Sequence, residues 1–143
     1  MFAWLARLLV RRSIRMHQAG DVKGLMKKTY GKNVHFVFPG KNSWAIDTTD
    51  KAELEKWLHR FHRVGLKLDV QDILVAGPPW NTRACLAFTD HAKDDAGNVV
   101  YENRGVIFAK GRWGKIIDYT VFEDTEKVAE FDRYLAVHEK VDA

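Results

Sequence analysis

The sequence has one cysteine and no long apolar run, and each scarcity excludes a class of protein. A lone Cys85 supports neither a disulfide framework within the chain nor a cysteine metal cluster, so we predict a reducing, cytoplasmic compartment. No stretch reaches the ~18 apolar residues that a membrane span needs. Repeats, linkers and low-complexity segments are also missing, so we expect residues 1–143 to form one domain.

Charge is present in moderate amounts, and its distribution matters more than its sum. The formal net charge of +4 is too small and too dispersed to predict a nucleic-acid partner. The first fifteen residues, MFAWLARLLVRRSIR, are interrupted by Arg7 and lack a small-residue cleavage site, so we expect a helix rather than a signal peptide. Such a basic amphipathic helix can bind a membrane. We favour a helix that packs Phe2, Leu5, Leu8 and Leu9 on the core, with solvated arginines.

Hydrophobic periodicity predicts an α+β domain with helices packed on one face of a curved sheet. Helices are expected before Gly20, over 22–29, from Asp50 to about residue 64, and after Asp124. Alternating apolar residues predict strands at 33–38, 66–75, 80–93, 99–110 and 115–124.

The two longest strands should form a central hairpin across the loop Gly111-Arg112-Trp113-Gly114. Pairing Lys110 with Lys115 would turn one face inward, made of Glu102, Arg104, Val106, Phe108, Ile117, Tyr119, Val121 and Glu123. The other face would be the outer surface, made of Tyr101, Asn103, Ile107, Ile116, Thr120 and Phe122. That surface is apolar enough to predict a homodimer through it.

Two strings, GDVKGLMKKTYGKNVHFVFPG and WGKIIDYTVFEDT, resemble segments of the nuclear transport factor 2-like superfamily, especially its SnoaL-like branch. The resemblance implies a cone-shaped half-barrel: a strongly curved, mainly antiparallel sheet, three helices from the N-terminal half on its concave side, and a C-terminal helix. It also implies a pocket inside the cone and frequent dimerisation through the convex face. This fold hosts isomerases, cyclases, hydrolases, transport factors and inert binders, so it leaves open whether the chain is an enzyme.

The catalytic residues of these enzymes are not found at the matching positions. The catalytic aspartate of ketosteroid isomerases falls at Phe38, their tyrosine at about Arg12 and their oxyanion-binding acid at about Arg104. The aspartate of SnoaL-type cyclases and limonene epoxide hydrolases falls at Val121, and residues 83–89 contain no Arg-x-Asp pair. The sequence therefore predicts neither ketosteroid isomerase nor epoxide hydrolase chemistry.

Arg104 is the leading candidate for a ligand contact, because the predicted register surrounds it with the small side chains Ala87 and Thr89. The alternative is a structural ion pair of Arg104 with Glu102 or Glu123. His91 and Tyr119 are further candidates for acid–base or hydrogen-bonding roles. The complete predicted pocket lining is Phe36, Phe38, Trp44, Trp57, Ala87, Thr89, Arg104, Tyr119 and Val121.

No metal or cofactor is predicted, because His59 and His62 have no third ligand in evident reach and Cys85 has no neighbouring base. The expected function is to bind or transform an apolar small molecule that carries a polar or anionic group. Two alternatives remain open: a non-enzymatic dimeric interaction module, and a peripheral membrane protein that uses the first helix.

Overall fold

The computed structural model of the chain describes residues 2–139, which form four helices and a six-stranded sheet. The helices are α1 (Phe2–Gln18), α2 (Val22–Lys28), α3 (Lys51–Arg63) and α4 (Thr125–His138). The strands are β1 (Tyr30–Phe38), β2 (Ile46–Thr48), β3 (Lys67–Ala76), β4 (Thr82–Lys93), β5 (Val99–Arg112) and β6 (Lys115–Glu123). The predicted α+β class is confirmed, and only the short β2 was not expected.

Aspartate caps fix where three of these helices begin. The Asp21 side chain accepts a hydrogen bond from the Gly24 amide, and the Asp50 side chain accepts one from the Ala52 amide, each 2.9 Å long. Asp124 likewise caps α4. These carboxylates satisfy amide groups that a helix leaves unpaired at its start, and for that reason the three positions could be read from the sequence.

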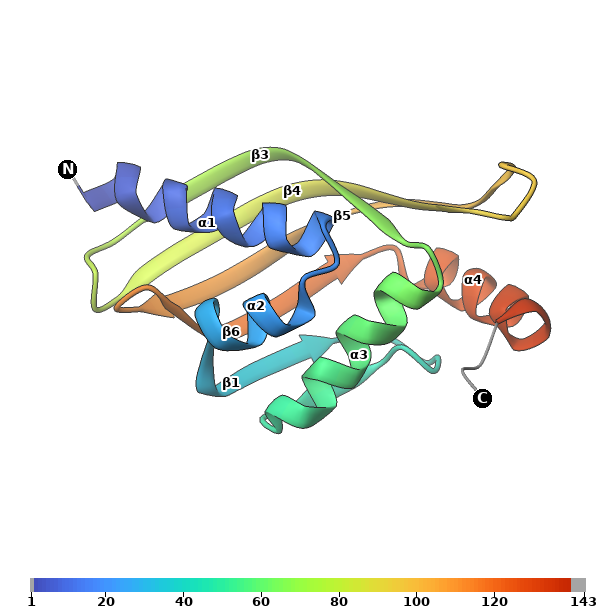
Figure 1. Cartoon of the computed structure of the whole chain (residues 1–143), viewed down its shortest axis with the longest axis horizontal. Helices are drawn as coiled ribbons and strands as arrows, with labels where there is room; N and C mark the ends of the chain where they lie inside the picture. The colour runs from blue at the N-terminus through green and yellow to red at the C-terminus, as the bar shows by residue number, and fades with distance from the viewer. Residues whose placement is uncertain (1, 140–143) are drawn as a thin grey trace.

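The sheet has the strand order β2-β1-β6-β5-β4-β3 and is curved without closing into a barrel (Figure 1). All neighbouring strands are antiparallel except β1 and β6, which are parallel. Helices α1, α2 and α3 cover the concave face, and α4 packs against β5 at one end. The predicted half-barrel with three helices on its concave side is therefore confirmed.

The predicted register of the central hairpin is wrong. Arg112, not Lys110, pairs with Lys115, because the turn contains only Trp113 and Gly114, with φ of 51° and 80°. A register shift next to Lys110 displaces the pairing further. The total displacement is an odd number of residues, and side chains alternate between faces. The side chains of β5 before the register shift, up to Phe108, therefore lie on the opposite face from the one predicted.

Helix α1 packs on the sheet along a line through Ala6, Val10, Ser13 and His17, one helical face. Leu5 and Leu8 lie off this line and are 42% and 47% exposed, so their predicted placement in the core is wrong. The core itself is centred on the completely buried side chains of Leu25, Val34, Phe36, Leu54 and Leu58.

Candidate functional site

Two adjoining cavities lie on the concave side of the sheet. The larger one, which we call the outer chamber, lies between α1 and the sheet and has a cavity volume of about 110 Å³. The smaller inner chamber, beside α3, offers about 30 Å³, space for roughly two waters. Tyr30 and Tyr119 line both chambers, with ring centroids 6.0 Å apart. A molecule filling the outer chamber would therefore reach the wall of the inner one.

Two carboxylic acids, Asp90 on β4 and Glu123 on β6, lie together in the wall of the inner chamber. Their side chains are close enough to interact directly, although β5 runs between their strands. The residue of β5 opposite Glu123 is Gly105. A Cβ atom there would lie 2.7 Å from the Glu123 Cβ and 2.9 Å from the Phe88 ring. Gly105 thus provides the space in which the two acids meet.

One oxygen of this acid pair has no partner. Asp90 is only 4% exposed, and its Oδ1 is buried without a hydrogen bond to any described residue. The surrounding wall of the inner chamber is mostly apolar and includes Phe38, Phe88 and Val121. A buried oxygen that is left unpaired costs free energy, so such atoms recur at sites that bind a ligand.

Tyr101 and Asn103 of β5 support the pair from one side. The Tyr101 hydroxyl lies 3.4 Å from Oε2 of Glu123 and receives a 3.0 Å hydrogen bond from the Asn103 amide. The same amide group donates to the Asp124 carbonyl at 2.9 Å, which fixes its orientation. The Tyr101 ring stacks on Phe131 of α4, with centroids 4.5 Å apart. The tyrosine hydroxyl is therefore held in place beside the carboxyl groups.

Burial shifts the ionisation of both acids towards neutral pH and above. Desolvation raises the pKa of Asp90 to about 6, and desolvation with repulsion from Asp90 raises the pKa of Glu123 to about 9. The interaction between the two acids lowers the pKa of Asp90 and raises that of Glu123, so the two groups titrate as one coupled pair. At pH 7 the pair holds one proton, mainly on Glu123, and Asp90 is mostly ionised.

His17 of α1 is the basic side chain of the inner chamber, and it also lines the outer one. Desolvation, followed by the nearby His62, lowers the pKa of His17 to about 4. Its ring packs edge-on against Phe61, with centroids 4.8 Å apart. His17 is therefore a neutral imidazole at pH 7, and it cannot neutralise the acid pair.

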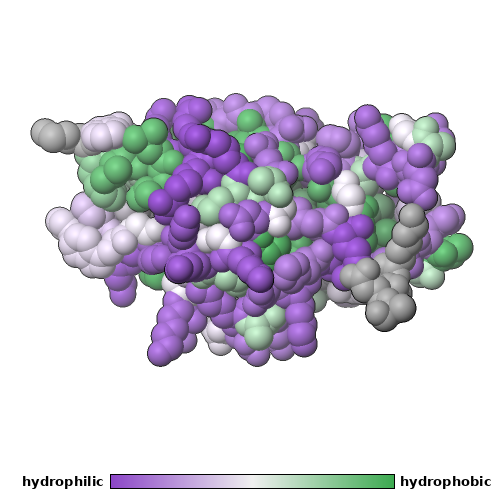
Figure 2. Space-filling model, in the orientation of Figure 1, coloured by the Kyte–Doolittle hydropathy of each residue, from purple (hydrophilic) through white to green (hydrophobic). Residues whose placement is uncertain are grey.

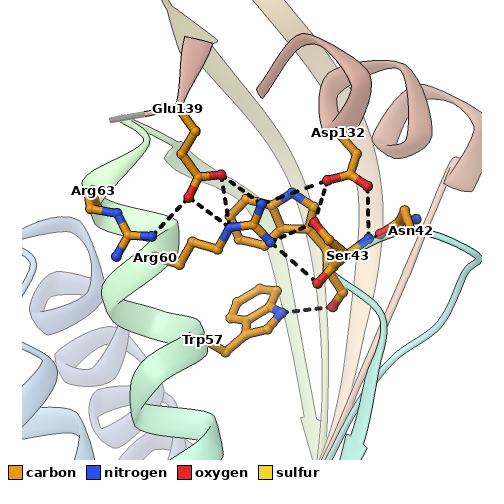
Figure 3. A network of polar contacts seen from close by, with 8 residues as sticks. Asn42, Ser43, Trp57, Arg60, Arg63, Asp132 and Glu139 are labelled. Carbon is orange, nitrogen blue, oxygen red and sulfur yellow. Dashed lines mark hydrogen bonds and ion pairs between the residues drawn. The ribbon is translucent and has the colours of Figure 1, made fainter. Parts of the chain in front are cut away.

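A polar cluster that we call the clasp connects separate elements of the fold and consists of Ser43, Arg60, Arg63, Asp132 and Glu139 (Figure 3). Arg60 of α3 donates to Glu139 at 2.8 Å, and Arg63 bridges the other Glu139 oxygen at 2.9 Å. The Ser43 amide donates to Asp132 of α4 at 2.8 Å. The clasp joins α3, α4 and the β1–β2 loop, and so holds α4 against the strands that carry Tyr101 and Glu123.

Several residues of the predicted pocket do lie in these chambers. Phe36, Phe38, Trp57, Tyr119 and Val121 line the inner chamber. Whether they bind a ligand stays a prediction. Trp44 lies behind them and is 2% exposed. Its carbonyl accepts a 2.9 Å hydrogen bond from the Trp57 indole, and Arg60 stacks 4.0 Å above its ring. Trp44 therefore packs beneath Arg60 of the polar cluster and does not line either chamber.

The predicted positions of Arg104, Ala87, Thr89 and His91 inside the cone are wrong. Arg104 is exposed on the convex face opposite Thr89, and Ala87 lies on that face opposite Val106. No ion pair joins Arg104 to another described residue, so the alternative of a structural pair with Glu102 or Glu123 is not found either. The reversed face of β5 explains the error at Arg104.

The alternation of side chains along β4 and β5 also explains where the other predicted residues lie. His91 neighbours Asp90 in sequence and therefore points away from it, with Nδ1 3.8 Å from a carboxylate oxygen of Asp69. Tyr101, Asn103 and Ile107, predicted on the outer face, are buried on the concave side. Ile116 lines the outer chamber. Of the six residues predicted on the outer face, Thr120 and Phe122 lie there, opposite Phe108 and Val106.

Neither Asp90 nor the acid–base role of Glu123 was predicted from the sequence. A signal for Asp90 was present: along β4 the inward positions are Ala84, Leu86, Phe88, Asp90 and Ala92. One carboxylate in a row of apolar residues marks a buried charge. Among residues 2–139, no group of three or more histidine, cysteine or acidic side chains could hold a metal ion. No helix in the same range is long and apolar enough to cross a bilayer.

Comparison with known proteins gives matches in structure but not in sequence. Neither a family model nor a curated protein matches the chain. Bal32a, from a soil-derived mobile gene cassette, superposes with a TM-score of 0.76 and 20% identity over 92% of this chain and 98% of its own. A nuclear transport factor 2-like protein from Burkholderia xenovorans gives 0.69 and 16%, over 89% and 95%. A candidate polyketide cyclase from Xanthomonas campestris gives 0.64 and 17%, over 90% and 97%.

These identities are low, so the matches establish the fold alone. They agree with the curved open sheet and the helices on its concave face described above. The predicted resemblance to the nuclear transport factor 2-like superfamily is confirmed at the level of the fold, and the chain has the nuclear transport factor 2-like fold.

Proposed function

We propose that the chain binds an apolar small molecule with a neutral polar group in the two chambers and transfers a proton on it at Asp90 and Glu123. The observation that carries this proposal is the unpartnered Oδ1 of Asp90, buried in an apolar wall. A carbonyl or hydroxyl group of a ligand, or a polarised C–H bond, would occupy the space in front of that oxygen.

The ionisation of the pair suits a general base and its proton reservoir. A base works best when its pKa lies near the working pH, and burial raises the pKa of Asp90 to about 6. Asp90 would remove a proton from carbon or oxygen next to a carbonyl group. The proton of Glu123, or the one just taken up by Asp90, would return to another atom of the same molecule. This exchange is a tautomerisation or isomerisation and needs no external reactant.

The charge of the inner chamber favours a neutral group there over an anionic one. Arg104, the predicted anion contact, lies on the other side of the sheet, and neither lysine nor arginine lines the inner chamber. An anionic substituent would instead suit the outer chamber, which Arg12, Lys28, Lys110 and Lys115 line. The proposed ligand therefore has an apolar body, a neutral reactive end, and room for a negative charge at its far end.

The alternative function, a dimeric interaction module, is favoured by a different observation. Leu74, Val106 and Phe122 are 61%, 37% and 55% exposed, and all three lie on the convex face. Large apolar side chains exposed on one sheet face are characteristic of an interface between copies. The dimer is compatible with proton transfer inside the cone, because the two surfaces are on opposite faces of the sheet.

Exchange of carbon-bound hydrogen in 2-indanone, a small apolar ketone, tests the proposal. In D₂O the wild-type protein should accelerate deuterium uptake beside the carbonyl, followed by proton NMR, and Asp90→Asn should lower the rate by roughly 10²–10⁴-fold. Glu102→Gln, on the exposed face of β5, is the matched control and should exchange like wild type. Equal rates for wild type and Asp90→Asn would refute proton transfer at this pair.

A further inference from the structure

Three segments meet at the end of the molecule where α1 begins (Figure 1). They are the first half of α1, the β3–β4 loop at 77–81, and the β5–β6 turn at 112–115. The Trp113 amide donates to the Pro79 carbonyl at 2.7 Å, and the Trp80 and Trp113 rings lie 6.0 Å apart, which joins loop to turn. A Cβ atom built on Gly114 would lie 3.5 Å from a Leu9 methyl, which places the turn against α1. We call this end of the molecule the tryptophan end.

Large apolar side chains are exposed at the tryptophan end. Ten are exposed among the described residues, and half of them are here: Trp4 59%, Leu5 42%, Leu8 47%, Trp80 57% and Trp113 68%. Figure 2 shows hydrophobic residues gathered at this end, next to a largely hydrophilic remainder. Soluble proteins seldom leave such a group in water unless it contacts something else.

Trp113 occupies a backbone conformation that its residue type does not favour. Its φ is 51°, in the left-handed region, and it is the only residue other than glycine with positive φ in the described part of the chain. Asparagine, aspartate or glycine would suit this position of a two-residue turn better. An exposed indole held in this unfavourable conformation indicates that its position at the tip has a use.

Charge at the tryptophan end has one sign only. The first half of α1, the β3–β4 loop and the β5–β6 turn contain Arg7, Arg112 and Lys115 and no acidic residue. Arg11 follows in the next turn of α1, and Lys110 precedes the β5–β6 turn. The apolar end of the molecule is therefore also a positively charged one.

We propose that the tryptophan end binds the surface of a bilayer containing anionic lipids. Indole rings prefer the headgroup region, leucines enter the hydrocarbon below it, and arginines meet lipid phosphates, so each exposed residue type has a role. The phosphate backbone of a nucleic acid would not bury the apolar side chains of Leu5 and Leu8. An acidic protein surface would not provide pockets for the exposed indole rings. The outer chamber is lined by residues of this same end, including Phe2 and Gly114.

Membrane binding by the tryptophan end does not depend on the proposed proton transfer. If both hold, the chamber would open beside the bilayer, from which an apolar ligand could enter without crossing water. Failure of the 2-indanone exchange would leave membrane binding unaffected, because the two experiments use different residues.

Tryptophan fluorescence tests the proposal directly, since three of the five tryptophans lie at this end. Adding vesicles of phosphatidylcholine with phosphatidylglycerol to the full chain should shift the emission to shorter wavelength, and pure phosphatidylcholine should bind about tenfold more weakly. Raising NaCl from about 0.1 M to about 1 M shortens the screening length from ~10 Å to ~3 Å and should release most of the protein.

Matched variants separate this surface from the others. Trp80→Ala/Trp113→Ala and, separately, Arg11→Gln/Arg112→Gln should each weaken vesicle binding about tenfold while far-UV circular dichroism stays unchanged. The controls are Leu74→Ala/Phe122→Ala on the convex face and Lys93→Gln/Lys127→Gln at the opposite end, and both should bind like wild type. No binding to anionic vesicles overturns the proposal, as does equal loss in the controls. The proposal would also be overturned if vesicle binding did not require Trp80 and Trp113, but self-association or duplex DNA binding did.

Discussion

The acid pair should make the protein less stable as pH rises, and substituting it should remove this effect. In the folded protein, burial raises the pKa of Asp90 from 3.8 to about 6 and that of Glu123 from 4.5 to about 9. Between about pH 4 and pH 9 the folded protein therefore holds protons that the unfolded chain has released. Stability falls with rising pH wherever the folded state binds more protons.

The size of the effect follows from the shifted ionisation. One pKa step corresponds to ~1.4 kcal/mol, so the change at Asp90 alone costs about 3 kcal/mol of unfolding free energy once the pH exceeds about 6. The larger change at Glu123 adds to this and is complete only above about pH 9. A loss of this size is a considerable fraction of the ~5–15 kcal/mol that stabilises a typical domain.

Urea unfolding of the double variant Asp90→Asn/Glu123→Gln measures this cost. The amides cannot ionise, so the advantage of the variant over wild type should grow by more than ~3 kcal/mol between about pH 4.5 and pH 9. All other titrating groups are shared, and the difference therefore isolates the pair. The control Glu102→Gln/Glu130→Gln removes two exposed carboxylates and should leave the wild-type slope unchanged. Parallel curves for wild type and the acid-pair variant would refute the raised pKa values.

Three further outcomes are expected. Arg104→Met should change the unfolding free energy by no more than about 0.5 kcal/mol, because Arg104 is exposed and has no ion pair among the described residues; a loss of several kcal/mol in a melting experiment would contradict its placement. Phe122→Glu should convert the proposed dimer to a monomer at tens of micromolar, a range in which a standard-sized interface holds, and light scattering that finds wild-type monomers there would exclude the dimer. Between about pH 6.5 and pH 4 the wild-type protein should lose unfolding free energy, because burial lowers the pKa of His17 to about 4 and only the unfolded chain takes up the proton. His17→Gln should reduce this loss by about 3 kcal/mol. An unchanged pH dependence in urea titrations would argue against a neutral His17.

Local chemistry made most of the fold predictable from the sequence. Asp21, Asp50 and Asp124 begin helices because their carboxylates pair with free amides nearby in the chain. The alternation of apolar residues in β4 and β5 marks strands for an equally local reason. These signals reach over a few residues, and for this reason the order of elements and the resemblance at the level of the fold could be deduced correctly.

The candidate site depended on information that is not local. A two-residue turn at Trp113-Gly114 and a register shift beside Lys110 decide which face of β5 turns inward, and both result from the pairing of whole strands. That choice moved Arg104 outside and Tyr101 inside. The contact between Asp90 and Glu123 also requires Gly105 on the strand between them, so no spacing along the chain could have indicated it.

The surface of α1 shows the same limit. The helical period correctly predicted an amphipathic helix, but the line of contact with the sheet runs through Ala6 and Val10 rather than through Leu5 and Leu8. Two leucines that composition assigns to the core are therefore available to contact a bilayer.

Carboxyl-carbon NMR of the protein, with Asp90→Asn and Glu123→Gln to assign the two resonances, measures whether the buried acid pair shares one proton at neutral pH. The proposed state of the pair gives the following expectations. It predicts that Asp90 titrates with a pKa of about 6 and that Glu123 remains protonated until the pH approaches about 9. It also predicts that binding of 2-indanone shifts the Asp90 resonance and leaves that of exposed Glu102 unchanged. If Asp90 and Glu123 both titrated near their ordinary pKa values of 3.8 and 4.5, the two acids would not share a proton at neutral pH.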